Sequence, residues 1–243
     1  MISLLIKEIN SFLGSLIGYI AMIVFLSSLG LFMWIFPGEM NILEAGYSQM
    51  NAFFYLAPWV FLFLIPAITM KSFSDEKKSG TLELIITKPL SELQIITAKF
   101  LAGLLLVVIS VLPAFIYVYS IYQLGNPIGN LDMGATWGSF FGLLFLGGAY
   151  VSIGIFASSV TENQIIAFIL AVFLCFFFFV GFDSISSLTL FQSFDTLIIK
   201  LGINEHYISM SRGVLDSRDL IYFISLIVVF LFLTKTVISS RKW

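Results

Sequence analysis

The stretch FLAGLLLVVISVLPAFIYVYSI (Phe100–Ile121) contains no charged residue from its first position to its last. A helix needs about 20 predominantly apolar residues to cross the hydrocarbon core of a bilayer. The apolar residues run continuously, whereas a strand of a membrane barrel alternates apolar and polar positions. The stretch therefore predicts a membrane-spanning helix.

The composition of the whole chain supports a membrane protein. Its 243 residues are 59% hydrophobic and 11% charged, and 27 of them are Phe. A soluble domain carries about 25% charged residues, so no soluble fold could hide this much apolar surface. The net charge of -2 gives no reason to expect nucleic acid as a partner, and the one Cys, Cys175, cannot form an internal disulfide. The N-terminus lacks a cleavage pattern and is expected to be retained.

Six stretches are long and apolar enough to span a bilayer, and the first five contain no charged residue. They predict an all-α, polytopic membrane protein that forms a single transmembrane domain over residues 1–243. The predicted spans are residues 15–36, 52–70, 100–121, 137–160, 165–182 and 220–238.

Lysine and arginine are distributed unevenly between the two sides of this arrangement. If both termini are cytoplasmic, nine of the 12 basic residues lie inside and three lie outside. Because cytoplasmic loops are enriched in lysine and arginine, the sequence predicts cytoplasmic N- and C-termini. The inner residues are Lys7, Lys71, Lys77, Lys78, Lys88, Lys99, Lys235, Arg241 and Lys242; the outer ones are Lys200, Arg212 and Arg218.

The segment before the first span, SLLIKEINSFLGS, has apolar residues at helical spacing with Lys7, Glu8 and Asn10 elsewhere. This pattern is typical of an amphipathic helix at the membrane surface. An early start of the first span is the alternative, and the residues alone do not decide between them.

Several kinds of chemistry lack the residues they need. The chain has no phosphate-binding loop motif, no nucleophile elbow, and only one His and one Cys, so neither an ATP site of that kind nor a His/Cys metal site is expected. The first five spans hold no acidic or basic residue, whereas proton-coupled pumps usually need one. We expect a protein that is not an enzyme, with no cofactor of its own, and whose energy comes from a partner.

Glycines repeat along the fourth span in GATWGSFFG, from Gly134 through Gly138 and Gly142, and continue to Gly147, Gly148 and Gly154. Small residues mark places where membrane helices approach closely. The pattern predicts either a seam facing a second chain or pore, or ordinary packing within one chain.

A long outer segment, Asp183–Asp219, separates the last two spans. Its stripe Phe194, Leu197, Ile198 and Leu201, followed by Gly202, predicts a short re-entrant or interfacial helix. The polar residues after it are either an outer gate or local ion pairs of a solvated hairpin. The gate candidates are His206, Arg212, Asp216 and Arg218.

The polar interval between the second and third spans falls in the predicted cytoplasm. The residues predict a charged stretch, a short helix capped by Thr81 with Glu83 in its first turn, a stop at Pro89, and a new helix. Ser91 and Gln94 match a capping box that opens this new helix. The short apolar helix would either dock in a groove of a partner or pack on the inner face of the membrane.

The segment EKKSGTLELIITKPLSELQIITAKFLA (Glu76–Ala102) resembles the hallmark of the ABC-2 type permease family. An acidic–basic pair precedes G-T-L-E-L, T-x-P follows, and a lysine begins the third helix. The six spans, the amphipathic start and the long outer segment extend the resemblance over essentially the whole chain. The segments FFYLAPWVFLFLIPAITMKSF and EHYISMSRGVLDSRDLIYF are similar to the gliding-motility-associated branch of that family.

The resemblance implies a permease subunit of an ATP-binding-cassette exporter in the cytoplasmic (inner) membrane. Two permease chains would pair around a central path, and each would dock a cytoplasmic ATPase that binds the ATP. The family places a coupling helix between the second and third spans, seated in a cleft of the ATPase. The residues that would transmit motion are Glu76, Lys77, Gly80, Thr81, Leu82, Glu83, Thr87 and Pro89.

A second hypothesis is a membrane scaffold or anchor of a motility or secretion assembly that uses the same fold without transport. An intramembrane enzyme is a remote third, because no nucleophile–base pair is visible. An ATPase that binds this chain fits either of the first two hypotheses. Substrate-stimulated ATP hydrolysis in reconstituted vesicles would separate them.

Overall fold

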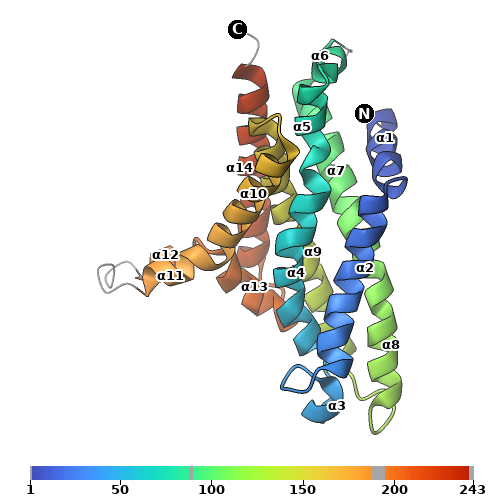
Figure 1. The fold of residues 1–243 in the computed structure, drawn as a ribbon. Coiled ribbons are helices and arrows are strands. Elements are labelled where there is room, and N and C mark those ends of the chain that lie inside the picture. Colours follow the sequence, from blue (N-terminus) through green and yellow to red (C-terminus); the bar gives the residue numbers. More distant parts are fainter. Residues whose placement is uncertain (1, 88–89, 188–194, 241–243) are drawn as a thin grey trace.

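The computed structural model describes residues 2–87, 90–187 and 195–240, and every regular element within these ranges is a helix (Figure 1). Six helical stretches are long and apolar enough to cross a membrane, which confirms the six predicted spans. Their bounds are Gly18–Ile35, Asn51–Lys78, Glu92–Leu124, Met133–Val160, Gln164–Ser186 and Ser217–Ser239.

The helices follow one another with short connections. In the first half they are α1 (Ile2–Leu13), α2 (Leu16–Gly30), α3 (Ile42–Ala45), α4 (Asn51–Thr69), α5 (Lys71–Lys78), α6 (Thr81–Ile86), α7 (Glu92–Val111) and α8 (Phe115–Leu124). In the second half they are α9 (Met133–Val160), α10 (Gln164–Phe176), α11 (Phe182–Ser186), α12 (Asp195–Ile199), α13 (Ile203–Ser211) and α14 (Ser217–Ser239). Short π or 3-10 turns continue three of them: η1 (Leu31–Ile35), η2 (Leu112–Ala114) and η3 (Phe177–Gly181).

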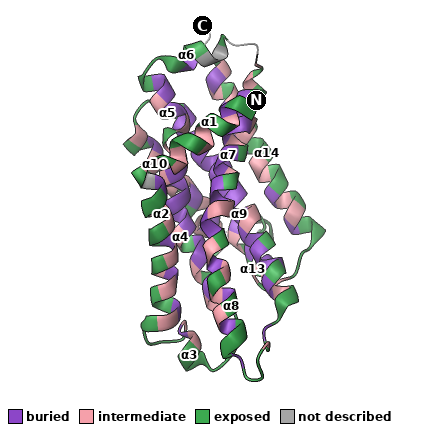
Figure 2. Cartoon of the chain, turned by 90° about the vertical axis from the view of Figure 1, so that its right-hand side faces the viewer, coloured by how far each residue is buried: buried purple, intermediate pink, exposed green. Residues whose placement is uncertain are grey.

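Helix α9 forms the centre of the bundle. It packs against α4, α5, α7, α10, α13 and α14. In its most apolar 18 residues 78% are buried, compared with 22% in the corresponding windows of the first, fifth and sixth spans. Figure 2 shows the buried residues gathered along the middle of the bundle. The outer helices therefore present apolar surface to lipid or to another chain.

The glycines of α9 are packed against other helices of the same chain. A Cβ atom on Gly138 would lie 2.5 Å from the carbonyl oxygen of Gly213, and one on Gly142 would lie 2.6 Å from Cβ of Met210. Both distances are shorter than real Cβ contacts, so only glycine allows α13 and the turn after it to lie this close. Of the two interpretations of the glycine pattern, the structure shows packing within one chain at these positions.

The N-terminal segment forms a helix of its own. Helix α1 ends at Leu13, and α2 starts anew at Leu16 after a break in which the Ser15 hydroxyl accepts a hydrogen bond from the Gly18 N–H at 3.2 Å. Helix α1 lies against α7. The segment is therefore an element separate from the first span rather than its early start, while its position at the membrane surface stays a prediction.

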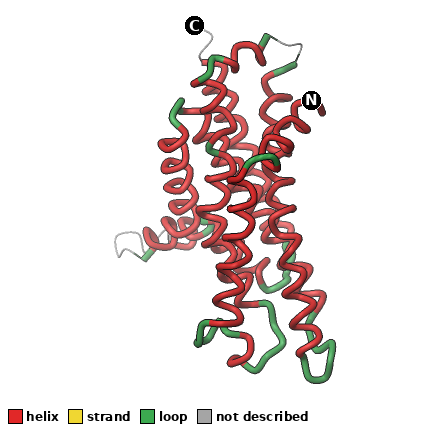
Figure 3. Tube along the Cα trace, turned by 45° about the vertical axis from the view of Figure 1, so that its right-hand side comes forward, coloured by secondary structure: helices red, strands yellow, loops and turns green. Residues whose placement is uncertain are grey.

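The start of α1 and the end of α14 lie at the same end of the bundle as α6, and α3 lies at the opposite end (Figure 1). Figure 3 shows the N and C labels together at one end of the bundle. An even number of spans requires this arrangement, and which end faces the cytoplasm stays a prediction. Helices α11 and α12 project to the side of the bundle (Figure 1). The short outer helix expected from the stripe is α12, and the Gly202 N–H bonds to the Ile199 carbonyl just after its end; Phe194 lies outside the described residues.

Replacing Gly138 by Ala should destabilise the protein by about 1–3 kcal/mol, because the added methyl meets the backbone of Gly213, which cannot move aside as a side chain can. The matched control is Gly134→Ala, four residues earlier on α9, where the nearest atom to an added Cβ is 3.4 Å away. That control should be neutral or stabilising, since Ala favours a helix over Gly. Thermal unfolding in detergent measures both. Equal melting temperatures for the two variants would contradict the packing described here.

Candidate functional site

The polar interval begins as a helix. Helix α5 follows α4 directly, and Met70 between them has helical backbone angles and donates its N–H to the Pro66 carbonyl. The expected charged stretch before the short helix is therefore not extended chain: Asp75 to Lys78 are helical. The apolar run ends before the helix does because the polar side chains of α5 find partners on neighbouring helices.

Four charged side chains from three helices meet at this end of the bundle. Lys99 of α7 lies with its Nζ 2.8 Å from Oε1 of Glu8 on α1 and 2.9 Å from Oε1 of Glu76 on α5. Lys7 Nζ lies 3.3 Å from the same Glu76 oxygen. Only 1% of the Lys99 side chain and 9% of the Glu76 side chain are exposed. We call Lys7, Glu8, Glu76 and Lys99 the charge cluster.

Lys99 is the best-satisfied member of the charge cluster. An ammonium group has three N–H donors, and those of Lys99 face Glu8, Glu76 and the backbone carbonyl of Ser72 at 2.6 Å. The same nitrogen lies 5.0 Å from the centre of the Phe73 ring. In contrast, Oε2 of Glu76 is buried and has no hydrogen-bond partner among the described residues. The cluster thus ties α5 to both α1 and α7.

Helix α5 is also bonded to the end of α9. The Lys77 ammonium donates to the backbone carbonyl of Ser159. The hydroxyl oxygen of Ser158 accepts the backbone N–H groups of Phe73 and Ser74 at 2.9 and 3.1 Å. Lys77 is 9% exposed. It therefore faces the protein's own interior and is not available to a cytoplasmic partner.

A further contact reaches the start of α10, where the Gln164 amide donates to the Asp75 carboxylate. Helix α5 is consequently held by α1, α7, α9 and α10 at once. Any displacement of α5 along or across its axis must move these helices or break buried polar contacts. Glu76 and Lys77, expected from the family resemblance to take part in coupling, are buried and contact other helices of the same chain.

The turn after α5 depends on Gly80. Its φ of +70° lies in the left-handed region, and its N–H bonds back to the Lys77 carbonyl at 3.2 Å, which closes the end of α5. The Thr81 hydroxyl lies 2.9 Å from the Ser79 hydroxyl and 3.5 Å from the Glu76 carbonyl. Thr81 was predicted to cap α6, but it is the first residue of α6 and its hydroxyl turns back to α5.

Helix α6 has one buried and one exposed side. Leu82 is 7% exposed and packs toward the bundle, whereas Glu83, in the first turn as predicted, and Leu84 face outward, with Leu84 65% exposed. Thr87 is exposed after the helix, and its hydroxyl donates to the Leu84 carbonyl at 3.0 Å. Pro89 lies outside the described residues. Among the side chains of α6 that the structure describes, Thr81, Glu83 and Leu84 are exposed, and exposed Thr87 follows the helix.

The predicted capping box is confirmed. The Gln94 N–H donates to the Ser91 hydroxyl at 3.3 Å, and the Ser91 N–H donates to the Gln94 side-chain oxygen at 3.0 Å. These bonds fix where α7 begins. They also place Lys99, two turns later, inside the charge cluster.

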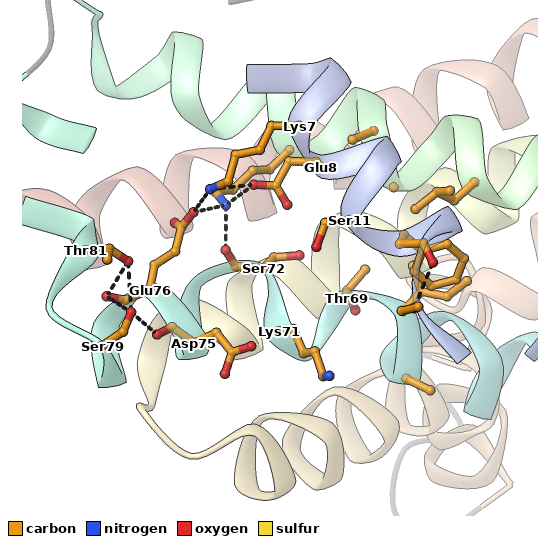
Figure 4. Close-up of a pocket in the computed structure, with 18 residues that line it drawn as sticks. Lys7, Glu8, Ser11, Thr69, Lys71, Ser72, Asp75, Glu76, Ser79 and Thr81 are labelled. Carbon is orange, nitrogen blue, oxygen red and sulfur yellow. Dashed lines mark hydrogen bonds and ion pairs between the residues drawn. The ribbon is translucent and has the colours of Figure 1, made fainter. Parts of the chain in front are cut away.

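A pocket of about 320 Å³ opens beside the charge cluster, between α1, α4, α5 and α7 (Figure 4). Figure 4 shows Lys7 and Glu8 reaching from α1 toward Glu76, with the Ser79 and Thr81 hydroxyls close to one another. The pocket shows that the cluster is packed on one side only. Helix α1 therefore has room to move relative to α5 once the ion pairs loosen.

The four gate candidates at the other end are not brought together as one site. His206 pairs with Asp219, its Nδ1 lying 2.7 Å from the carboxylate oxygen. The Asp216 side chain accepts the Arg218 N–H at 2.9 Å and so caps α14. Arg218 itself is exposed, and Arg212 is an exposed residue that lines a pocket of about 490 Å³ between α4, α11 and α13. Local ion pairing and capping describe His206 and Asp216 better than a shared gate.

From the sequence, Lys7 and Lys99 served as markers of orientation, Lys7 and Glu8 as polar residues of an amphipathic helix, and Lys99 as the lysine of the family motif, but Glu8 was not connected with either lysine. The sequence did contain one indication of the charge cluster: Lys99 lies at the edge of an apolar run, where a charged side chain must pair with another group or reach water. Its partners could not be identified, because Glu8 and Lys99 are 91 residues apart.

The sequence model of one family, described as "ABC-2 family transporter protein", matches residues 13–242, which include every span and the whole interval from α5 to α7. No curated protein matches the chain.

Replacing Lys99 by Met should destabilise the protein by about 3–5 kcal/mol, because the carboxylates of Glu8 and Glu76 lose the charge that compensates them. The control is Lys71→Met, which removes a charge from an exposed residue lining the same pocket and should have little effect. Adding Glu76→Gln to Lys99→Met should recover part of the loss. Thermal unfolding in detergent measures all four proteins, and a Lys99→Met variant as stable as the control would contradict the role of the charge cluster.

Proposed function

Because the chain belongs to the ABC-2 transporter family, we propose that it is the permease subunit of an ATP-binding-cassette exporter in the cytoplasmic membrane, coupled to a separate cytoplasmic ATPase. In this proposal the ATPase binds and hydrolyses ATP, and the permease has neither a cofactor nor a catalytic residue of its own. Both chain termini and α6 lie on the cytoplasmic side.

Helix α6 is the element that docks into the ATPase. The observation that carries this proposal is its two-sidedness: Leu82 is buried against the bundle while Leu84 is 65% exposed beside the carboxylate of Glu83. An exposed apolar residue on a short helix at the polar end of a membrane protein favours a protein groove as its partner. Glu83 adds a charge that fixes the orientation in that groove.

The connection from α6 to the spans runs through α5. When the two ATPases close on ATP, a push on α6 reaches α5 through the Gly80 turn. Since the buried contacts of Glu76 lead to α1 and α7, and those of Lys77 lead to α9, the push is distributed over the bundle rather than absorbed in a loop. The roles of Gly80, Thr81, Thr87 and Pro89 in coupling are part of the same proposal.

A second permease chain, identical or different, completes the transporter. The apolar, mostly exposed windows of the first, fifth and sixth spans provide surface for this chain and for membrane lipids. The low polarity of the spans fits an amphipathic or lipid-like cargo. Nucleic acid is not expected among the partners of a chain with net charge -2.

A role in gliding motility is the narrower form of the proposal. It is supported by the resemblance of residues 53–73 and 205–223 to the gliding-motility-associated branch of the family. A transporter with another physiological role uses the same fold, so this narrower form depends on what the complex exports.

Replacing Glu83 by Arg should abolish co-purification of the cytoplasmic ATPase, since the charge on the docking face is reversed. Leu84→Asp should have the same result because it places a second charge at the apolar contact. The matched control is Glu39→Arg, the same substitution at an exposed residue of the opposite end, which should leave the complex intact. Retention of the ATPase by both α6 variants would refute docking at α6.

Orientation is tested with single cysteines at Glu83 and Asn126, both exposed and at opposite ends of the bundle. The native Cys175 is buried and should give little background. An impermeant thiol reagent added to intact cells should label Asn126→Cys and leave Glu83→Cys unlabelled until the cells are opened. Labelling of position 83 from outside would reverse the orientation and remove the cytoplasmic docking site.

A further inference from the structure

The ring of His206 lies between two hydrogen-bond acceptors. Its Nδ1 is 2.7 Å from Oδ1 of Asp219 on α14, and its Nε2 is 3.0 Å from the backbone carbonyl oxygen of Lys200, just after α12. The side chains of His206 and Asp219 are 14% and 11% exposed. The contact with Asp219 is partly buried, whereas the contact with the Lys200 carbonyl lies at the surface.

These two contacts fix how many protons the imidazole needs. A neutral imidazole has one N–H and one lone pair, so one of its nitrogens always presents a lone pair. A peptide carbonyl has no proton to donate, and neither has an ionised carboxylate. Only the imidazolium, with an N–H on each nitrogen, makes both contacts as hydrogen bonds, and the carboxylate of Asp219 neutralises its charge.

We propose that His206 is doubly protonated in this arrangement and acts as a proton-dependent link between α13, the end of α12 and the first turns of α14. The bond to Asp219 connects α13 with α14, and the bond to Lys200 connects α13 with the chain that follows α12. The proposal concerns this chain's own fold and holds whichever side of the membrane this end faces.

Other side chains around His206 fix the position of its ring. The Tyr222 ring stacks on the imidazole with centroids 3.9 Å apart and planes at 19°, and its hydroxyl donates to the Leu201 carbonyl at 2.6 Å. On α13 itself the neighbouring Glu205 is exposed, and the Tyr207 hydroxyl points to the Phe54 carbonyl of α4 at 2.7 Å. Among the elements that pack on α13, α4, α9 and η3 have no residue that is charged at neutral pH, while the Asp183 carboxylate of α11 accepts a hydrogen bond from Asn204 of α13 at 2.8 Å. Asp219 is the carboxylate in direct contact with the ring.

Loss of one proton has a defined consequence. If Nε2 loses its proton, its lone pair faces the Lys200 carbonyl; if Nδ1 loses it, the lone pair faces the Asp219 carboxylate. Either way one contact becomes repulsive, so the link is intact while both ring nitrogens carry a proton and is lost when one proton leaves. Helix α13 also forms one wall of the 490 Å³ pocket, so its release would change that pocket.

His206 is the only histidine in the chain, which makes the first test direct. The full chain, labelled with 15N-histidine and placed in lipid nanodiscs, should give two imidazole nitrogen signals that are both protonated at pH 5. As the pH is raised, one of them should move to the unprotonated range. Asp219→Asn removes the charge that compensates the imidazolium and should weaken retention of the second proton. A ring with only one protonated nitrogen at pH 5 would overturn the proposal without any variant being needed.

The second test measures the link itself. Spin labels on Glu205→Cys in α13 and Met133→Cys at the start of α9 report the distance between the two helices, because both positions are exposed and Cys175 is buried. The distance distribution should be narrow at pH 5 and broad at pH 8. In His206→Gln, which has a donor and an acceptor but does not titrate, the distribution should not depend on pH. A pH-independent distribution with His206 present, or the same pH response in His206→Gln, would overturn the proposal.

Discussion

The ammonium of Lys99 is the interaction on which this end of the bundle depends. It is 1% exposed, and its three donors are used by carboxylates of α1 and α5 and by a backbone carbonyl of α5. A buried charge is stable only while its partners stay in place, because their attraction and hydrogen bonds offset the free-energy cost of removing the charge from water. The positions of α1, α5 and α7 are therefore coupled: α5 cannot shift without moving α1 and α7 or breaking these contacts.

The bilayer imposes the complementary constraint on the rest of the chain. Backbone groups in hydrocarbon must be satisfied within a helix, so hydrophobic stretches become spans almost independently of their neighbours. What then arranges the spans is packing, and α9 provides it through glycines that admit α13 and the following turn to contact distance. The centre of the bundle is thus close-packed and mostly apolar, while the charged contacts lie at its two ends.

The parts of the fold that the sequence predicts are the local ones. The run Phe100–Ile121 defines a span by its length, and the Ser91–Gln94 box defines a helix start because its two partners are three residues apart. The helical state of Asp75 to Lys78 was missed, since it depends on partners in α1, α7, α9 and α10 that no local pattern reveals. For the same reason the sequence identified His206 as a polar residue of interest but not its partners.

In the candidate site, too, local features could be predicted from the sequence and contacts between distant residues could not. The short helix with Glu83 in its first turn was predicted from local residues, whereas its exposed side and the inward direction of Glu76 and Lys77 required the folded chain. Their burial changes what they can do. Glu76 and Lys77, which a motif alone would assign to the contact with an ATPase, instead connect α5 with other helices of the same chain.

The most direct measurement of this coupling is the distance between labels at Tyr47 and Val214, two exposed residues at the end opposite α6, in the complex with its ATPase. Adding ATP should change this distance when the charge cluster is intact. In Glu76→Gln the ATPase should still co-purify, because α6 is unaltered, but the ATP-driven change should be reduced or lost. An unchanged response in that variant would show that force reaches the spans by a route other than the charge cluster.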